Sequence, residues 1–222
     1  MSIRKIYRTI KRLPERIKYR KPSDTFLRLG TEYGGWWVET KDFNSDSKII
    51  SAGLGQDISF DLALIEKYGC QIIGLDPTPK ATDYVAQKTA SVPNFVFQQV
   101  AIAKSDGVLH LSPPENSKNV SFKLSGEEEG IAFPCKSLTT ILKELDWDGI
   151  DLLKMDIEGA EFEVLQDLVE KNILVNQLCV EFHRDLAIQQ NIVLKDFLVF
   201  VQKHGFRLVY KEYDNYTFLR TN

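Results

Sequence analysis

Cysteine is scarce in this chain, and its distribution argues against a disulfide-stabilised fold and against a zinc-binding fold. Only three of the 222 residues are cysteine, no two of them form a CxxC pair, and they lie far apart: Cys70, Cys135 and Cys179. Each lies in or beside an apolar run, where a free cysteine is commonly a small buried hydrophobe. A disulfide framework or a zinc site is therefore not expected, and a reducing compartment such as the cytoplasm fits.

Long apolar stretches are also missing. No hydrophobic run reaches the ~18 residues that a membrane-spanning helix needs. The basic N-terminal stretch is not followed by an apolar core, so we do not expect a secretory signal. No internal repeat or low-complexity segment is present, and the hydrophobic (43%) and charged (27%) shares are ordinary. These features predict a globular protein with one large core.

A large net charge is absent overall but present locally. The net charge is −3, so the chain as a whole does not indicate nucleic-acid binding. Residues 1–21 nevertheless hold nine Lys and Arg against one acid, a net +8, which leaves −11 for the remainder. This stretch also carries a helical apolar stripe, interrupted by Pro14: Ile3, Ile6, Ile10, Leu13 and Ile17. We predict a basic helical arm over residues 1–29, followed by one domain over residues 30–222.

Two roles are open for this arm. The first, which we favour, is docking on the acidic body or on a partner subunit. The second is peripheral attachment to a membrane or another polyanion, which one short interrupted helix would support only weakly.

From about Lys48 onward, short apolar strands alternate with helices. The predicted strands are 48–52, 71–75, 94–100, 151–155, 178–182, 206–210 and 216–219, and the predicted helices are 57–68, 81–89, 137–145, 161–170 and 195–204. This alternation predicts right-handed βαβ units and a parallel sheet with helices on both faces. Five residues separate the last two strands, too few for a parallel crossover, so these two should pair antiparallel.

A glycine loop follows the first of these strands. Gly53 and Gly55 come directly after strand 48–52, where glycine allows a sharp turn and a close approach to a ligand. Asp76 ends the second strand, 21 residues beyond Gly55, and a carboxylate there can accept hydrogen bonds from a ribose diol. The combination predicts a nucleoside cofactor.

The same loop lacks two features of a dinucleotide site. Ile58 stands where that fingerprint has its third glycine, and Asp57 beside the helix start would repel a pyrophosphate. A nicotinamide-dependent oxidoreductase is thereby disfavoured. A cofactor with ribose, adenine and a cationic centre but no phosphate fits better, and S-adenosylmethionine has that composition. The residues expected to bind it are Ala52, Gly53, Leu54, Gly55, Asp57, Ser59, Asp76, Pro77, Thr78, Ala101 and Ile102.

Some of these assignments have alternatives. Asp57 either pairs with the amino group of the donor or caps the following helix. Ala101 and Ile102 either contact the adenine or belong to the ordinary core. Trp36 and Trp37 follow two glycines and form either a lid over the donor or a clamp between arm and core. The polar segment 112–130 is expected to border the acceptor pocket.

An acidic pair follows the predicted strand 151–155. Asp156 and Glu158 fall at its carboxyl end, where open α/β sheets bind ligands, and they share one face if the strand continues. His183 ends the next strand at the same edge. We predict a catalytic set of Asp156, Glu158, His183 and Lys154, with Lys154 as a salt-bridge partner or a substrate-orienting group.

The pattern leaves open what this set does. The acids or His183 could remove a proton from a hydroxyl. Asp156, Glu181 and His183 could hold a divalent metal. Alternatively, His183 is a hydrogen-bonded structural residue.

Several of these motifs resemble one family. Leu153–Glu161 resembles the signature of the FkbM-type methyltransferases, and the other segments resemble motifs of one branch of it: Ile50–Asp61, Gly74–Pro79, Tyr33–Trp37 and Val180–His183. The resemblance covers roughly residues 30–220 and excludes the basic arm. One departure is Leu54–Asp57, where many members carry an Asn-rich loop; this indicates a branch whose substrates we cannot name.

The resemblance implies the class I methyltransferase fold, a Rossmann-like seven-stranded sheet with its last strand reversed. It also implies S-adenosylmethionine as methyl donor and a hydroxyl of a sugar, glycan or small metabolite as acceptor. No nucleic-acid partner is expected, and metal dependence and oligomeric state stay open. The competing hypothesis is a non-catalytic donor-binding module on the same fold, tethered by its arm to a membrane or a partner.

Overall fold

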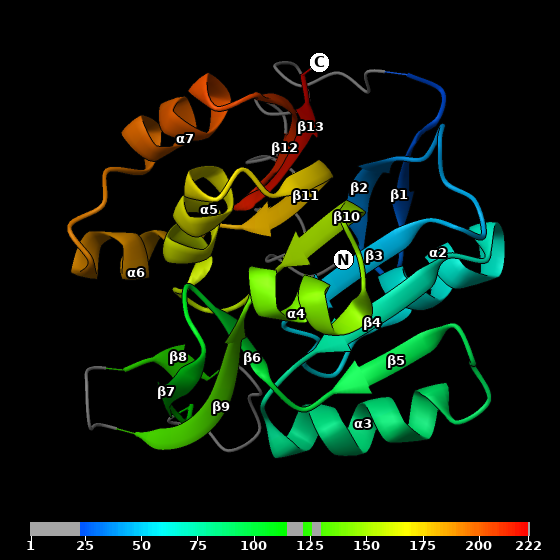
Figure 1. Cartoon of the computed structure of the whole chain (residues 1–222), viewed down its shortest axis with the longest axis horizontal. Helices are drawn as coiled ribbons and strands as arrows, with labels where there is room; N and C mark the ends of the chain where they lie inside the picture. Colours follow the sequence, from blue (N-terminus) through cyan, green and yellow to red (C-terminus); the bar gives the residue numbers. More distant parts are fainter. Residues whose placement is uncertain (1–22, 115–121, 126–129, 222) are drawn as a thin grey trace, which may run out of the picture.

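A seven-stranded sheet forms the centre of the molecule (Figure 1). The computed structural model describes residues 23–114, 122–125 and 130–221. The strands are β3 (Lys48–Ala52), β4 (Gln71–Leu75), β5 (Phe95–Gln98), β10 (Gly149–Met155), β11 (Leu174–Glu181), β12 (Phe206–Glu212) and β13 (Asn215–Arg220), in the spatial order β12-β13-β11-β10-β3-β4-β5. Every pair from β11 to β5 is parallel, and β13 runs antiparallel to both of its neighbours. The predicted mostly parallel sheet with a reversed last strand is confirmed.

Helices cover both faces of this sheet, as predicted. Helices α2 (Ser59–Tyr68) and α3 (Pro79–Thr89) pack on one face, where Phe60, Leu64 and Val85 are buried. The other face is covered by α4 (Leu138–Leu145), α5 (Glu161–Glu170) and α7 (Leu194–Lys203). A short helix, α6 (Arg184–Gln189), follows β11. The central strands read as continuous apolar runs because both of their faces are covered.

Two smaller sheets were not predicted. One contains β6 (Ala101–Ala103), β9 (Ile131–Ser137), β7 (Gly107–Ser112) and β8 (Lys123–Leu124), in that spatial order. The predicted strand 94–100 is wrong at its end: the amide of Val100 bonds back to the carbonyl of Gln98 at 2.9 Å. This tight turn ends β5 and directs the chain into β6, which pairs with β9.

The second small sheet pairs β1 (Phe26–Leu29) with β2 (Trp36–Glu39). The predicted helical arm therefore does not extend to residue 29, because residues 26–29 are a strand. Phe26 is fully buried, and its ring lies 5.8 Å from that of Trp37 and 5.4 Å from that of Tyr210. The rest of the arm, residues 1–22, lies outside the described residues. Within the described ranges, no helix has the length and apolar character to cross a bilayer.

Side chains join the β1–β2 hairpin to the central sheet. Gln177 on β11 is 4% exposed; its amide oxygen accepts from the Glu39 amide (2.8 Å), and its amide nitrogen donates to the Glu39 carbonyl (3.0 Å). Thr217 on β13 donates to the Trp37 carbonyl at 2.7 Å. These bonds satisfy the backbone groups of β2 where no neighbouring strand does so.

Replacing Gln177 by Leu should therefore destabilise the fold. Two backbone groups of Glu39 lose their partners, and we expect the free energy of unfolding in urea to fall by about 2–4 kcal/mol. Gln202→Leu is the matched control, because Gln202 is exposed on α7 and its loss should change stability by less than about 0.5 kcal/mol. Equal losses in the two variants would contradict the bridging role of Gln177.

Candidate functional site

A cavity of about 480 Å³ opens at the carboxyl ends of β3, β4, β10 and β11. Its volume is in the range of small-molecule sites, and its position is the ligand edge of an open α/β sheet. All but one of the predicted site residues line it: Ala52, Gly53, Leu54, Gly55, Asp57, Asp76, Pro77, Thr78, Ala101, Ile102, Lys154, Asp156, Glu158, Glu181 and His183. The exception is Ser59, which points elsewhere because its hydroxyl accepts a bond from the Thr31 amide at 2.8 Å.

The glycine loop lies directly against the acidic strand end. Gly53 has φ +74°, and a Cβ placed on it would be 1.7 Å from the carbonyl oxygen of Asp156. Its amide donates to the Leu75 carbonyl at 2.9 Å, and the amide of Asp156 donates to the Ala52 carbonyl at 3.1 Å. No side chain fits at residue 53 without moving this backbone.

Asp76 holds the same loop from the neighbouring strand. One carboxylate oxygen accepts from the amides of Leu54 (2.9 Å) and Gly55 (3.0 Å), and the other accepts from the amide (2.9 Å) and hydroxyl (2.6 Å) of Thr78. A carboxylate offers about four acceptor positions, so these bonds use them all. Asp76 thus closes the glycine loop through bonds within the protein, and its contact with a ribose stays a prediction.

Asp57 bonds to the start of α2 and to the loop before β2. Its carboxylate accepts from the Ser59 amide (2.9 Å) and from the Thr31 hydroxyl (2.5 Å). Burial raises the pKa of Asp57, but the hydrogen bonds from Ser59, Thr31 and the Gly34 backbone outweigh it and lower the pKa overall. The predicted helix-start contact is present, whereas pairing with an amino group of the donor stays a prediction.

Lys154 does not form the predicted salt bridge with the acidic pair. Lys154 is 6% exposed, and its ammonium donates to the carbonyls of Ala52 (3.2 Å) and Gly53 (2.5 Å). The same ammonium lies 5.7 Å from the centre of the Trp36 ring. Because β10 lies beside β3, the Lys154 side chain reaches the glycine loop that follows β3 and holds it through these two hydrogen bonds.

His183 lies among three carboxylates. Its Nδ1 is 2.5 Å from an oxygen of Glu161, and its Nε2 is 3.2 Å from Glu158 and 3.6 Å from Asp156. Glu161 is fully buried in the first turn of α5, and its second oxygen accepts from the amide of Gly159. The sequence analysis missed Glu161, because an acid at a helix start usually indicates only a favourable dipole contact.

These carboxylates determine the charge state of the cluster. Burial lowers the pKa of His183, but the hydrogen bond and charge of Glu161, followed by the charges of Glu158 and Asp156, raise it to about 10. Burial raises the pKa of Glu181 to about 7, and Asp156 adds to that rise. His183 is therefore held as an imidazolium, with its Nδ1 hydrogen-bonded to Glu161 and its Nε2 in ion pairs with Glu158 and Asp156.

One donor atom from each of Asp156, Glu158 and His183 lies within 4.8 Å of the others. This trio differs from the predicted metal set, because Glu158 takes the place of Glu181. Glu158 has φ +54°, in the turn between β10 and α5. A histidine whose other nitrogen is held by a carboxylate is a common arrangement around metals, so the chemistry of these donors fits a divalent cation.

The remaining wall combines predicted and unpredicted residues. Ala101 and Ile102 line the cavity from β6, Leu109 and Leu111 line it from β7, and Phe122 lines it from the segment 112–130, whose place beside an acceptor stays a prediction. Trp36 lines the cavity but is only 4% exposed, so it is a wall residue and not a mobile lid. Trp37 packs against Phe26 and Tyr210, which also contact each other, and a contact of Trp37 with the basic arm stays a prediction because residues 1–22 lie outside the described residues.

Strand order and cavity position together define a class I methyltransferase fold with its cofactor edge. The sequence matches the model of the methyltransferase FkbM domain over residues 41–208. The chain belongs to this methyltransferase family, whose methyl donor is S-adenosylmethionine.

Individual relatives are distant. The human protein described as probable methyltransferase-like protein 24 is 25% identical over 145 residues, which are 63% of this chain and 33% of that protein. The chain thus spans about a third of the length of this curated relative.

Solved structures with a similar arrangement were also found. Fibrillarin of Methanococcus jannaschii has 12% identity and a TM-score of 0.46 over 81% of this chain and 68% of its own. The N-methyltransferase NodS of Bradyrhizobium japonicum has 12% identity and a TM-score of 0.43 over 79% and 86%. Monomeric WbdD has 14% identity and a TM-score of 0.46 over 79% and 36%.

The close approach of Gly53 to Asp156 can be tested with a matched pair of glycines. Gly69 also has a positive φ (+71°), but a Cβ there would meet nothing nearer than 3.5 Å. Gly69→Ala should therefore lower the free energy of unfolding by about 1–2 kcal/mol, because alanine is strained in the left-handed conformation. Gly53→Ala should cost about 2 kcal/mol more, because the Asp156 backbone must move. Denaturant titration measures both, and equal costs would contradict the close approach.

Proposed function

We propose that this chain is an S-adenosylmethionine-dependent methyltransferase that methylates a hydroxyl group of a sugar, glycan or small metabolite. One observation carries the proposal: Asp156, Glu158 and His183 converge in the cavity whose wall also includes the glycine loop. A donor site and a proton-accepting group therefore share one cavity. Membership of the FkbM methyltransferase family supports the transfer reaction.

The charge of the cavity supports the donor. Its lining includes eight acidic residues: Glu32, Asp57, Asp76, Asp156, Glu158, Glu181, Glu212 and Asp214. Such a surface repels the phosphates of a dinucleotide and favours a cation. S-adenosylmethionine carries a sulfonium and no phosphate, and when bound it would supply an electrophilic methyl group. Gly53 and Gly55, held by Asp76 and Lys154, present a backbone surface that such a ligand could approach closely.

The acidic cluster supports a hydroxyl acceptor. As the new oxygen–carbon bond forms, the hydroxyl must lose its proton, and a nearby base accelerates this step. Asp156 is the cluster acid with the more accessible side chain (35% exposed against 18% for Glu158), so we assign the proton to its carboxylate. His183, oriented by Glu161, donates toward the two acids and keeps them in place. Positioning of the acceptor supplies the rest of the acceleration.

Methyl transfer from radiolabelled S-adenosylmethionine tests the reaction. With a panel of sugars, glycans and small hydroxyl compounds, we expect a product whose label resists mild alkali, as an ether does and an ester does not. Asp156→Asn should lower kcat by about 10²–10⁴-fold and leave the affinity for S-adenosylhomocysteine unchanged. Glu163→Gln is the control, because Glu163 is exposed on α5 and does not line the cavity. Donor binding without transfer to any acceptor would instead support the non-catalytic module.

The role of Asp76 is tested by binding alone. Asp76→Asn keeps the size of the side chain but offers one oxygen where four donors now converge. We expect calorimetry to show an affinity for S-adenosylhomocysteine at least about tenfold weaker, since bonds to a charged acceptor contribute about 1.5–3 kcal/mol. Asp106→Asn is the control: Asp106 also accepts two bonds, from Ser137 and Thr140, but it does not line the cavity. Unchanged affinity in Asp76→Asn would contradict its role in holding the loop.

A further inference from the structure

The loop between β1 and β2 is held by an arginine at its base. The guanidinium of Arg28 donates to the carbonyls of Thr31 (2.6 Å) and Glu32 (3.0 Å), and its Nε lies 3.2 Å from a carboxylate oxygen of Glu212. Glu212 is the last residue of β12, so one side chain joins β1, the loop and the edge strand of the sheet. The planar guanidinium thus makes one bond to a carboxylate oxygen and two to backbone carbonyls, and its rigid donor geometry fixes the direction of all three.

Further bonds hold the same loop from the side of α2. The amide of Thr31 donates to the Ser59 hydroxyl (2.8 Å), and its own hydroxyl donates to Asp57 (2.5 Å) and accepts from the amide of Gly34 (3.0 Å). A Cβ on Gly35 would lie 2.4 Å from the Thr31 carbonyl, so the turn is tightly closed. These bonds hold the β1–β2 loop in one conformation as part of the cavity wall.

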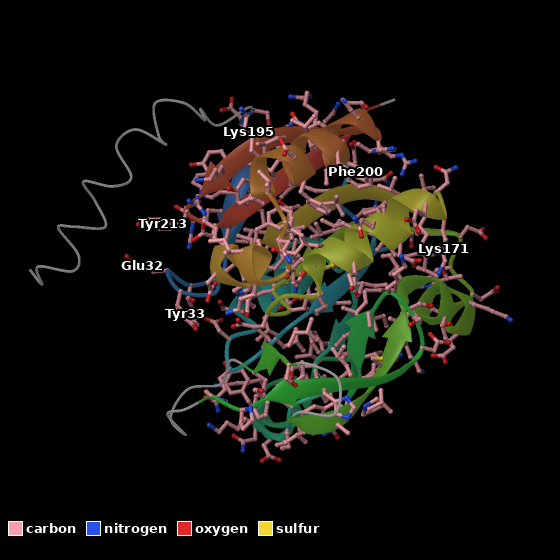
Figure 2. The ribbon with its side chains drawn as sticks, turned by 90° about the vertical axis from the view of Figure 1, so that its left-hand side faces the viewer. Glu32, Tyr33, Lys171, Lys195, Phe200 and Tyr213 are labelled. Carbon is pink, nitrogen blue, oxygen red and sulfur yellow. The ribbon has the colours of Figure 1, made fainter. Side chains whose placement is uncertain are left out.

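This built loop presents a large aromatic side chain to solvent. Tyr33 is 83% exposed and also lines the cavity, which places it at the rim. Figure 2 shows Tyr33 projecting on the same side of the molecule as Glu32 and Tyr213, two other lining residues. Partial burial and then the charges of Asp156, Glu181, Glu158 and Asp57 raise the pKa of its phenol. The charges of these cavity acids therefore act on the phenol at the rim.

The described residues that line the cavity offer an anion no unpaired cation. Among the lining residues the cations are Arg28, Lys154 and His183, and each is already bound: Arg28 to Glu212 and two carbonyls, Lys154 to Ala52 and Gly53, His183 to its acids. The carboxylates around them repel anions but accept hydrogen bonds from hydroxyls.

We propose that Tyr33 binds the acceptor by stacking, and that the cavity rim selects an uncharged, hydroxylated ring. The inference rests on the proposed methyl transfer and adds a specificity-determining residue to it. Aromatic faces pack against flat or CH-lined rings, and a rigidly held ring loses little conformational freedom on binding. A pyranose and a phenol share this chemistry, and they form separate arms of the test.

The first experiment observes Tyr33 directly. The full chain, with 3-fluorotyrosine at position 33 and saturated with S-adenosylhomocysteine, is titrated by fluorine NMR. The neutral probes are methyl glucopyranoside, methyl galactopyranoside and hydroxyphenyl methyl ether, and their anionic counterparts are methyl glucuronide and hydroxybenzoate. We expect the resonance to shift on titration with at least one neutral ring. The anionic counterpart of that ring should bind with a dissociation constant at least tenfold higher. The proposal would be overturned if no neutral ring shifts the resonance, or if the anionic forms bind with the same dissociation constants as the neutral ones.

The second experiment separates stacking from structure. For the ring that binds most tightly, Tyr33→Ala should weaken binding or raise KM about tenfold and leave kcat within threefold, whereas Tyr33→Phe should stay near wild type. Ile188→Ala, at another exposed apolar side chain (74% exposed) outside the cavity lining, is the control. Calorimetry with S-adenosylhomocysteine is run on each variant. If the wild-type chain does not bind S-adenosylhomocysteine, the proposed function is refuted. If it does bind, and Tyr33→Ala binds the acceptor as tightly as wild type, only the role of Tyr33 is refuted.

Discussion

The structure of the site depends on the contact between the glycine loop and the acidic strand end. Gly53 and Asp156 directly follow the neighbouring parallel strands β3 and β10, and their backbones approach so closely that only a glycine fits at residue 53. Asp76 binds this loop from one side through its amides, and Lys154 binds it from the other through its carbonyls. A loop whose donors and acceptors are satisfied in this way keeps its shape without a ligand. The cavity is consequently preformed, as small-molecule sites usually are.

Excess negative charge is the second constraint on this region. Three carboxylates surround His183, and their combined effect keeps the imidazole protonated despite its burial. Burial, followed by the charge of Asp156, raises the pKa of Glu181 to about 7. A cation or a proton relieves such a cluster, whereas an additional anion would aggravate it. The same electrostatic argument therefore bears on the donor, on a divalent metal and on the charge of the acceptor.

The outline of the fold could be predicted because its signals are local. Apolar runs such as Lys48–Ala52 and Gln71–Leu75 match the observed strands residue for residue. Ser137, at the start of the predicted helix 137–145, caps α4 by accepting from the Thr140 amide at 3.2 Å. Three features were not predictable in this way: the hairpin of β1 and β2, the departure of β6 from the central sheet, and the absence of a helix at residues 26–29. Each depends on partners distant in the chain, such as Tyr210 for Phe26 and Gln177 for Glu39.

The sequence by itself determined the sheet, the residues at its ligand edge and the family. Strand ends, glycines and acids are read along the chain, and parallel strands bring their carboxyl ends to one edge. Only the tertiary structure decided the roles of these residues, because roles depend on which atoms face each other. It directed Lys154 to the glycine loop, used both oxygens of Asp76 within the protein, placed Glu161 behind His183 and brought Tyr33 to the rim. Side-chain direction and burial follow from packing between distant segments, which no local pattern encodes.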